Sequence, residues 1–247
     1  MLVLAMESSA KPASVAVVSV LRDEEHTASD PPVIKLLGQY YQNCGLTHSR
    51  TLLAMTESLL NSLDLKPVDI GLVAVSHGPG SFTGVRIGVS AAKGIAWGLD
   101  KPVCGVSTLE AMAYQTTGYS VLKGADADTC CIICPVMDAR REQVYNALFE
   151  LRGGTLVRLC DDRAISLEDL AVELRGFSAP CILIGDGVEV CQINSGFSHC
   201  LTTPELLHYQ TAYGVALAAI NTEPVPAAEL EPSYLRPSQA ERERSKL

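Results

Sequence analysis

Apolar runs and polar turns alternate along the first part of the chain in an order that predicts three strands, a helix, a further strand and a second helix. The short valine-rich runs near the N-terminus are separated by the polar stretch 7–12, which predicts a hairpin. From Thr47, a suitable N-cap, leucines recur at helical spacing for about 15 residues. A glycine-rich turn then joins a buried strand to a helix full of small residues. The strands are expected at 2–6, 14–21, 33–41 and 72–76, and the second helix at 85–98.

The second half of the chain repeats this order of elements. Capping boxes at Ser107–Glu110 and Ser166–Asp169 predict two helix starts, and the first of them follows a short strand around Val103. The other elements are expected as strands at 131–138, 143–150, 155–160 and 181–184, a glycine turn at 185–187 and a helix at 204–221. The repetition predicts an α/β protein of two similar lobes, 1–104 and 105–247, the second with a frayed tail of about eight residues.

Composition narrows the class of protein. Of the 247 residues, 47% are hydrophobic and 19% charged, which is typical of a globular chain. No apolar run approaches the ~20 residues that span a bilayer, so no membrane association is expected. Nine cysteines scattered through apolar segments favour the reducing cytoplasm. A net charge of −9 argues against direct binding of phosphate backbones, so we expect this chain not to hold a nucleic acid by itself.

Two turns could hold an anion. The turn at Glu7-Ser8-Ser9 offers hydroxyls and backbone N–H groups to a phosphate and a carboxylate to a magnesium-bound water, although a polar hairpin turn would look the same. The segment 77–84 places glycines before a helix start, which suits either an anion cradle or a tight strand-to-helix connection. The candidate anion loop consists of Glu7, Ser8, Ser9, Gly78, Gly80, Ser81, Thr83 and Gly84.

Other chemically suggestive residues have plainer explanations. Arg86 could reach a phosphate or a partner's carboxylate, or it could be a solvated surface arginine. A lone histidine such as His48 at a helix start is more often a cap or surface residue than a ligand. Cys130, Cys131 and Cys134 have a C-x-x-C spacing without a second pair, so we interpret them as buried strand thiols. The signatures of the usual hydrolases are absent from the sequence.

Several segments together resemble the TsaB (YeaZ) family. They are LVLAMESS with SVAVV, THSRTLL (47–53), the long run 78–113 beginning GPGSFTGVR, MDARREQVY (137–145) and EPSYLR (231–236). This resemblance implies an actin-like ATPase (ASKHA, RNase H-like) fold with two duplicated βββαβα lobes. It also implies a non-catalytic scaffold, paralogous to the transferase TsaD. With TsaD and the small ATPase TsaE, such a scaffold supports formation of N6-threonylcarbamoyladenosine on tRNAs that read ANN codons.

The resemblance also bears on cofactors. The catalytic paralogue holds a metal through histidines after the strand that follows its glycine-loop helix, and the matching stretch here, 106–112, contains no histidine. We therefore expect no metal site, no catalytic residue and no intrinsic cofactor, with ATP or ADP bound only at the interface of the complex. Met6-Glu7 stands where the family commonly has an Asp-Thr type pair, and a shift of one residue along a strand reverses the face on which a side chain lies.

The same resemblance assigns the two helices of the first lobe to the contact with TsaD, or to a homodimer when TsaD is absent. The expected interface residues are His48, Arg50, Leu52, Leu53, Thr56, Val85, Arg86, Val89, Ala92, Lys93 and Ala96. A charged residue at position 89 is expected to abolish the complex. The alternative function is that of an independent enzyme, either an ATPase of the actin-like type or an M22-like peptidase.

Overall fold

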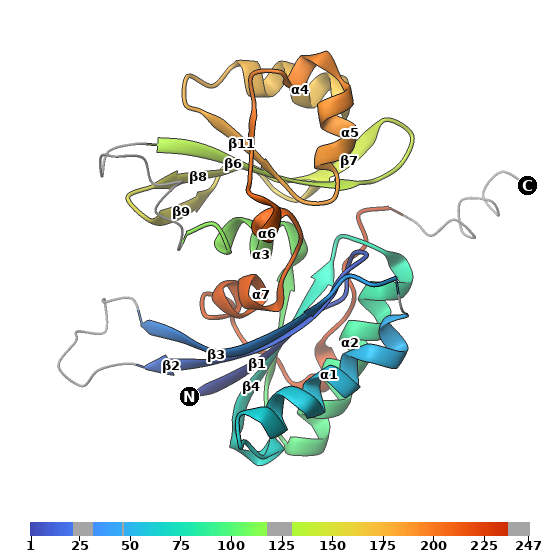
Figure 1. Ribbon diagram of the computed structural model, residues 1–247, viewed down its shortest axis with the longest axis vertical. Helices are drawn as coiled ribbons and strands as arrows, with labels where there is room; N and C mark the ends of the chain where they lie inside the picture. Colours follow the sequence, from blue (N-terminus) through green and yellow to red (C-terminus); the bar gives the residue numbers. More distant parts are fainter. Residues whose placement is uncertain (22–31, 46, 118–129, 237–247) are drawn as a thin grey trace, which may run out of the picture.

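The computed structural model describes residues 1–21, 32–45, 47–117 and 130–236, and within them it forms two β-sheets arranged one above the other (Figure 1). The expected frayed tail lies outside these residues. Within the described part of the chain, none of the helices combines the length and the apolar character that crossing a bilayer requires.

The first sheet has five strands in the order β3-β2-β1-β4-β5. β1 pairs antiparallel with β2 and parallel with β4, so the predicted hairpin is confirmed. Side chains of β1 alternate between the faces: Leu4 and Met6 pack towards α1 and α2, whereas Val3 and Ala5 pack towards α7. The strands are β1 (Leu2–Glu7), β2 (Ala13–Leu21), β3 (Val33–Gln42), β4 (Ile70–Gly78) and β5 (Val103–Ser107).

Two long helices, α1 (His48–Ser62) and α2 (Phe82–Leu99), cover one face of this sheet (Figure 1). A single 3₁₀ turn, η1 (Pro67–Asp69), leads from α1 towards β4. Thr47 occupies the predicted N-cap position of α1, but its side chain makes no capping hydrogen bond. α2 begins earlier than predicted, because the Ser81 hydroxyl accepts a hydrogen bond from the Gly84 N–H and so caps a helix that starts at Phe82.

The second sheet repeats the first. Its strands β9-β8-β6-β11-β12 follow the same order and directions as β3-β2-β1-β4-β5, with β11 parallel to β6. This repetition confirms the duplicated fold class. The strands are β6 (Cys130–Asp138), β7 (Gln143–Asn146), β8 (Phe149–Arg152), β9 (Thr155–Arg158), β10 (Arg163–Ser166), β11 (Cys181–Ile184) and β12 (Leu201–Thr202).

Two predictions for the second lobe are wrong in detail. The single strand expected at 143–150 is two strands, because β7 pairs with the end of β6 and β8 with its beginning. The single helix expected at 204–221 is also two, α6 (Glu205–His208) and α7 (Ala212–Ala219), since the Thr211 hydroxyl accepts from the Gly214 N–H and caps a new helix that starts at Ala212. β10 and the helix after the glycine turn, α5 (Val188–Ile193), were not anticipated, whereas α4 (Leu167–Arg175) begins at its predicted Ser166 cap.

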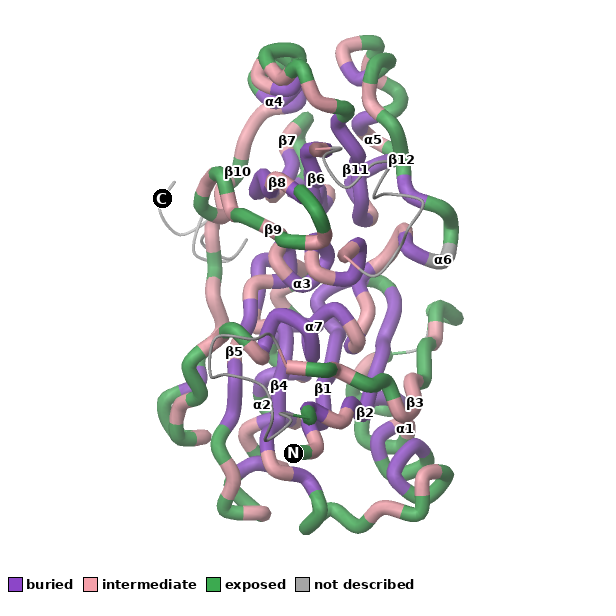
Figure 2. The backbone as a smooth tube through the Cα atoms, turned by 90° about the vertical axis from the view of Figure 1, so that its left-hand side faces the viewer, coloured by how far each residue is buried: buried purple, intermediate pink, exposed green. Residues whose placement is uncertain are grey.

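α7 and α3 (Thr108–Tyr114) lie between the two sheets and join the lobes (Figure 1). α7 packs on the first sheet and α3 on the second, and the two helices contact each other. The amide of Gln115 donates to the carbonyls of Leu207 and Tyr209 and so fixes the chain that leads into α7. Figure 2 shows the buried backbone concentrated along the sheets and these helices.

The segment after α7 also belongs to the first lobe's core. Val225 forms a β-bridge with Val103, and Leu230, only 3% exposed, packs in the cluster beneath α2. Two further 3₁₀ turns, η3 (Ser195–Phe197) and η4 (Ala227–Glu229), lie in the connecting segments. The predicted division at 104 assigns residues 212–230 to the second lobe, whereas their side chains pack on the first sheet.

The contact between α3 and α7 predicts a position where even a methyl group is too large. A Cβ at Gly214 would collide with the carbonyl oxygen of Ala111, so Gly214→Ala should cost about 1–3 kcal/mol of unfolding free energy. Gly94→Ala is the control, because a Cβ on this exposed glycine of α2 meets no atom within 4 Å and should stabilise the protein by up to about 1 kcal/mol. Urea denaturation of both variants tests this; equal effects would contradict the close helix packing.

Candidate functional site: the groove between helices α1 and α2

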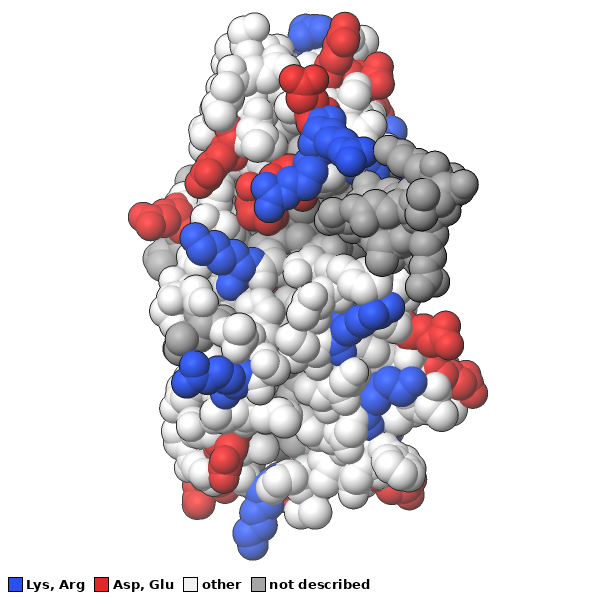
Figure 3. Space-filling model, turned by 90° about the vertical axis from the view of Figure 1, so that its right-hand side faces the viewer, with Lys and Arg blue, Asp and Glu red and all other residues white. Residues whose placement is uncertain are grey.

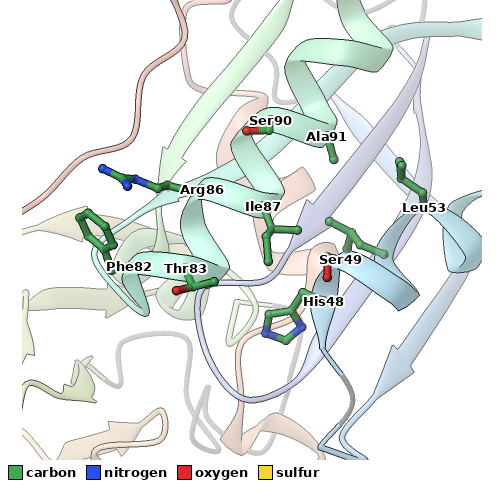
Figure 4. Close-up of a pocket in the computed structure, with 10 residues that line it drawn as sticks. His48, Ser49, Leu53, Phe82, Thr83, Arg86, Ile87, Ser90 and Ala91 are labelled. Carbon is green, nitrogen blue, oxygen red and sulfur yellow. The ribbon is translucent and has the colours of Figure 1, made fainter.

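A groove of about 620 Å³ runs between the start of α1 and the first half of α2 (Figure 4). His48 and Ser49 lie on its α1 side, and Phe82, Thr83 and Arg86 at the N-terminal end of α2. Leu52, Leu53 and Ile87 contribute apolar side chains to it, and Ser90 and Ala91 contribute small ones. The lining residues are His48, Ser49, Leu52, Leu53, Phe82, Thr83, Arg86, Ile87, Ser90 and Ala91.

A second hollow of about 350 Å³ continues along the same pair of helices. Leu53 lines both hollows, and its side chain is 53% exposed although it is large and apolar. Beyond it, the second hollow is lined by Glu57 and Asn61 of α1 and by Ile95 and Leu99 of α2. The two helices therefore present a long, largely apolar seam to solvent.

The structure corrects the predicted interface, because six of the eleven chosen side chains are buried. Leu52 and Val85 are each 1% exposed and pack against the first sheet, so almost none of either side chain is available to a partner. The same holds for the rest of the buried group, which comprises Leu52, Thr56, Val85, Val89, Ala92 and Ala96. A charge at position 89 would therefore disrupt the core of the lobe rather than test an interface.

The remaining predicted interface residues lie at or near the seam. Arg50 and Leu53 are exposed on α1, and Arg86 is exposed on α2. His48 is partly buried, and its Nε2 lies 2.8 Å from the carbonyl oxygen of Ala10, which holds the start of α1 against the turn after β1. Their contact with a partner stays a prediction.

Two of the basic residues on α2 are held by the segment that returns from the C-terminus. The Arg86 guanidinium lies 3.8 Å from the centre of the Phe82 ring, and its Nε donates to the Tyr234 hydroxyl over 2.8 Å. Lys93 donates to the carbonyls of Ala228 and Leu230 at 3.0 and 2.9 Å. Lys93 thus has an internal structural role, whereas Arg86 is fixed at the end of the groove.

The two segments of the candidate anion loop, 7–9 and 78–84, pack against each other. The Ser81 N–H donates to the Ser9 carbonyl over 2.6 Å, and the Ser8 hydroxyl donates to the Gly84 carbonyl over 2.9 Å. A Cβ at Gly84 would collide with the Ser8 carbonyl oxygen. Gly84 therefore allows close packing. Gly80 does the same against Ser9, and Gly78, whose φ is +124°, does the same against Ser233. Anion binding here stays a prediction, as does a role for Thr83, which lies exposed at the groove.

Glu7 is buried at the centre of this contact. Its Oε1 accepts a hydrogen bond of 2.6 Å from the Ser9 N–H. Its Oε2 and the hydroxyls of Ser9 and Ser76 are also buried and have no hydrogen-bond partner among the described residues. Burial raises the pKa of the Glu7 carboxyl above its ordinary value, and the hydrogen bonds around Ser9 only partly oppose this shift.

The stretch 106–112 joins the lobes through an ion-pair network. Ser107 caps α3 and also donates to Asp162. Arg158 pairs with Asp162 at 2.7 Å and with Glu110 at 2.9 Å. In the described residues, no three His, Cys, Asp or Glu side chains are grouped so that they could hold a metal ion. Cys131 and Cys134 are buried strand thiols, as predicted, while Cys130 is partly exposed.

Comparison with known proteins shows which family this chain resembles. The family model described as TsaD, tRNA N6-adenosine threonylcarbamoyltransferase, matches residues 42–193. Two relatives named as the tRNA threonylcarbamoyladenosine biosynthesis protein TsaB are 35% identical over 150 residues in Bacillus subtilis and 36% identical over 111 residues in Escherichia coli. The chain belongs to this family, in its TsaB (YeaZ) branch.

A solved structure shares the fold of this chain, whereas the sequence alignments with the relatives cover only part of each chain. A solved structure of YeaZ from Pseudomonas aeruginosa superimposes with a TM-score of 0.72, covering 95% of this chain and 99% of that chain at 24% identity, which shows that the fold is shared. The alignments cover 61% of this chain and of the Bacillus subtilis protein, and 45% of this chain and of the Escherichia coli protein. The chain thus spans less than two thirds of the length of these TsaB relatives.

Several residues of the groove between α1 and α2 were not predicted from the sequence. Ile87, Ser90 and Ala91 line it, although the stripe chosen from the sequence was the neighbouring one that faces the sheet. Phe82 and Tyr234 were not assigned a role, and their ring centres lie 4.8 Å apart. The signal that the sequence offered for this face of α2 was the spacing of Thr83, Ile87, Ser90 and Ala91, which recur at helical intervals.

Burial of Glu7 predicts a pH-dependent stability. Because its pKa is raised in the folded protein, the stability it contributes is fully present below the unfolded pKa near 4.5 and is lost as pH rises towards the folded pKa. Glu7→Gln should match the wild type at low pH and then gain about 1.4 kcal/mol relative to it per pH unit within that window. Asp186, whose pKa is raised to about 6 mainly by burial and in smaller part by the Glu7 charge, also titrates in this range in both proteins. Urea denaturation from pH 4 upward tests this; a constant difference would contradict it.

Proposed function

We propose that this chain is a non-catalytic subunit that supports formation of N6-threonylcarbamoyladenosine on tRNA by docking, through the α1–α2 seam, onto the transferase subunit TsaD. The observation that carries the proposal is the seam itself, which exposes Leu53 between two apolar hollows. The names of the TsaB relatives support the pathway.

The seam has the shape that a helical partner needs. Small side chains such as Ser90 and Ala91 let helix axes approach to the lower end of the ~8–10 Å range, and Leu53 then enters the partner's groove. Two helices that expose a common apolar groove are completed by two more, as in a four-helix bundle. The same surface would serve a homodimer when the partner is absent.

Recognition of the other components follows from charge. Arg86, fixed by Phe82 and Tyr234, presents a cation at the end of the seam for a carboxylate of TsaD or for the phosphates of ATP or ADP bound at the interface. On the face shown in Figure 3, Lys and Arg side chains are dispersed among acidic ones rather than gathered in one patch. With a net charge of −9, the chain meets tRNA only indirectly, through a complex that also includes TsaE.

The proposal separates this chain from an independent ATPase or peptidase. Purified TsaD and TsaE, supplied with threonylcarbamoyl-adenylate and tRNA, should modify the tRNA only when this chain is added, and the chain alone should hydrolyse neither ATP nor peptides. Modification without the chain would refute the scaffold role, and ATP hydrolysis by the chain alone would favour the independent enzyme.

A pair of adjacent substitutions tests the docking surface. Leu53→Glu places a carboxylate between both hollows and should weaken binding to TsaD by at least about 100-fold, because an unpaired charge would be buried at the contact. Ala54→Glu adds the same charge one residue away, at an exposed position of α1 that lines neither hollow.

Isothermal titration with TsaD measures both affinities, and circular dichroism confirms that both variants fold. Wild-type affinity for Ala54→Glu with loss for Leu53→Glu is the expected pattern. Equal affinities for the two variants would contradict docking through the seam.

A further inference from the structure

Two cysteines lie side by side at the edge of the second sheet, far from the α1–α2 seam. β11 and β12 run parallel, with Ile182 opposite Leu201 and Leu183 opposite Thr202. One position earlier stand Cys181, the first residue of β11, and Cys200, which directly precedes β12. Neighbouring strands are about 4.8 Å apart, which falls within the Cα separation of about 4.4–6.8 Å that a disulfide requires.

The side chains of this pair lie on the same face of the sheet and contact each other. Both pack in the apolar cluster beneath α4 and α5. The two thiols interact, which lowers the pKa of Cys181 and raises that of Cys200. Cys181 is only 2% exposed, whereas Cys200 is partly exposed, so a reagent from solvent meets Cys200 first.

A base lies beside the accessible thiol. The Nε2 of His199 is 3.6 Å from the Cys200 sulfur, and the imidazole is exposed to solvent. A thiol reacts as its thiolate, so a neighbouring proton acceptor is the group that Cys200 needs. Cys191 lies in the same cluster but is fully buried, so a reagent from solvent does not reach its sulfur.

We propose that Cys181 and Cys200 form a redox modification site that closes to an intramolecular disulfide when the protein meets a peroxide. His199 takes the Cys200 proton, and the thiolate sulfur bonds to one oxygen of hydrogen peroxide as the O–O bond breaks. The other oxygen leaves as water after receiving that proton. Cys200 is then a sulfenic acid.

Cys181 completes the reaction. Its sulfur attacks the Cys200 sulfur, the S–S bond forms, the S–O bond breaks, and the hydroxyl leaves as water with the Cys181 proton. Two thiols are thereby oxidised by two electrons and one peroxide is reduced to two waters. A thiol reductant reverses the step. The bond would fasten β12 to β11 around residues 182–199, which include α5.

The test uses the full chain, reduced and then treated with hydrogen peroxide, alkylated under denaturing conditions and cleaved after glutamate. Cleavage at Glu189 separates Cys181 from the peptide that holds both Cys191 and Cys200, so fragmentation of the linked pair by mass spectrometry identifies the cysteine joined to Cys181. We expect the Cys181–Cys200 link, the loss of two alkylatable thiols and full recovery with dithiothreitol. Cys200 over-oxidised to sulfinic acid while Cys181 remains alkylatable would overturn the proposal, as would a link to Cys191.

Three variants assign the roles. Cys181→Ser should leave a sulfenic acid on Cys200 that dimedone captures, and absence of this adduct would contradict the order of attack. His199→Gln should slow disulfide formation roughly tenfold or more, and an unchanged rate would exclude the imidazole as the base. Cys44→Ser removes an exposed cysteine of the first lobe and should leave the link intact; its loss would show that the pair is not the site. None of these readouts depends on tRNA modification.

Discussion

The close contact between the turn after β1 and the start of α2 determines the geometry of the first lobe. The Ser8 carbonyl occupies the space where a side chain at position 84 would begin, and the Ser9 carbonyl receives the Ser81 N–H. Only hydrogen at Gly84 allows the helix to lie this close to the sheet. Because α1 and α2 pack on the same face of that sheet and leave the groove between them, a displaced α2 would change the groove as well.

The returning C-terminal segment reinforces this arrangement from the other side. Leu230 fills the core beneath α2, and Lys93 reaches down to the backbone around it. The segment then passes Arg86, where Tyr234 binds the guanidinium, and continues to the second lobe, where Arg236 donates to the Ala139 carbonyl over 2.9 Å. One strip of chain thus orients the cation of the groove and connects the two lobes.

The order of strands and helices was predictable because each element carries its own hydrophobic period and cap. Ser107 and Ser166, for example, cap their helices as their sequences indicate. The exposed face of α2 was not predictable. Val89 and Ala92 face the sheet while Ser90 and Ala91 face solvent, and both stripes consist of small or apolar residues, so the period alone cannot tell them apart. The contact of Tyr234 with Arg86 joins distant parts of the sequence, where local pattern carries no information.

In the proposed complex, the exposed seam and no other surface receives the transferase subunit TsaD. Covalent footprinting with a photogenerated carbene, which labels accessible side chains, measures this directly when the chain is labelled with and without TsaD. If the seam is the docking surface, labelling of Leu53, Ile87 and Ser90 should fall sharply in the complex, while labelling of Ile193, which is 86% exposed on the second lobe, should be unchanged. Undiminished labelling along the seam with protection of the second lobe would contradict it.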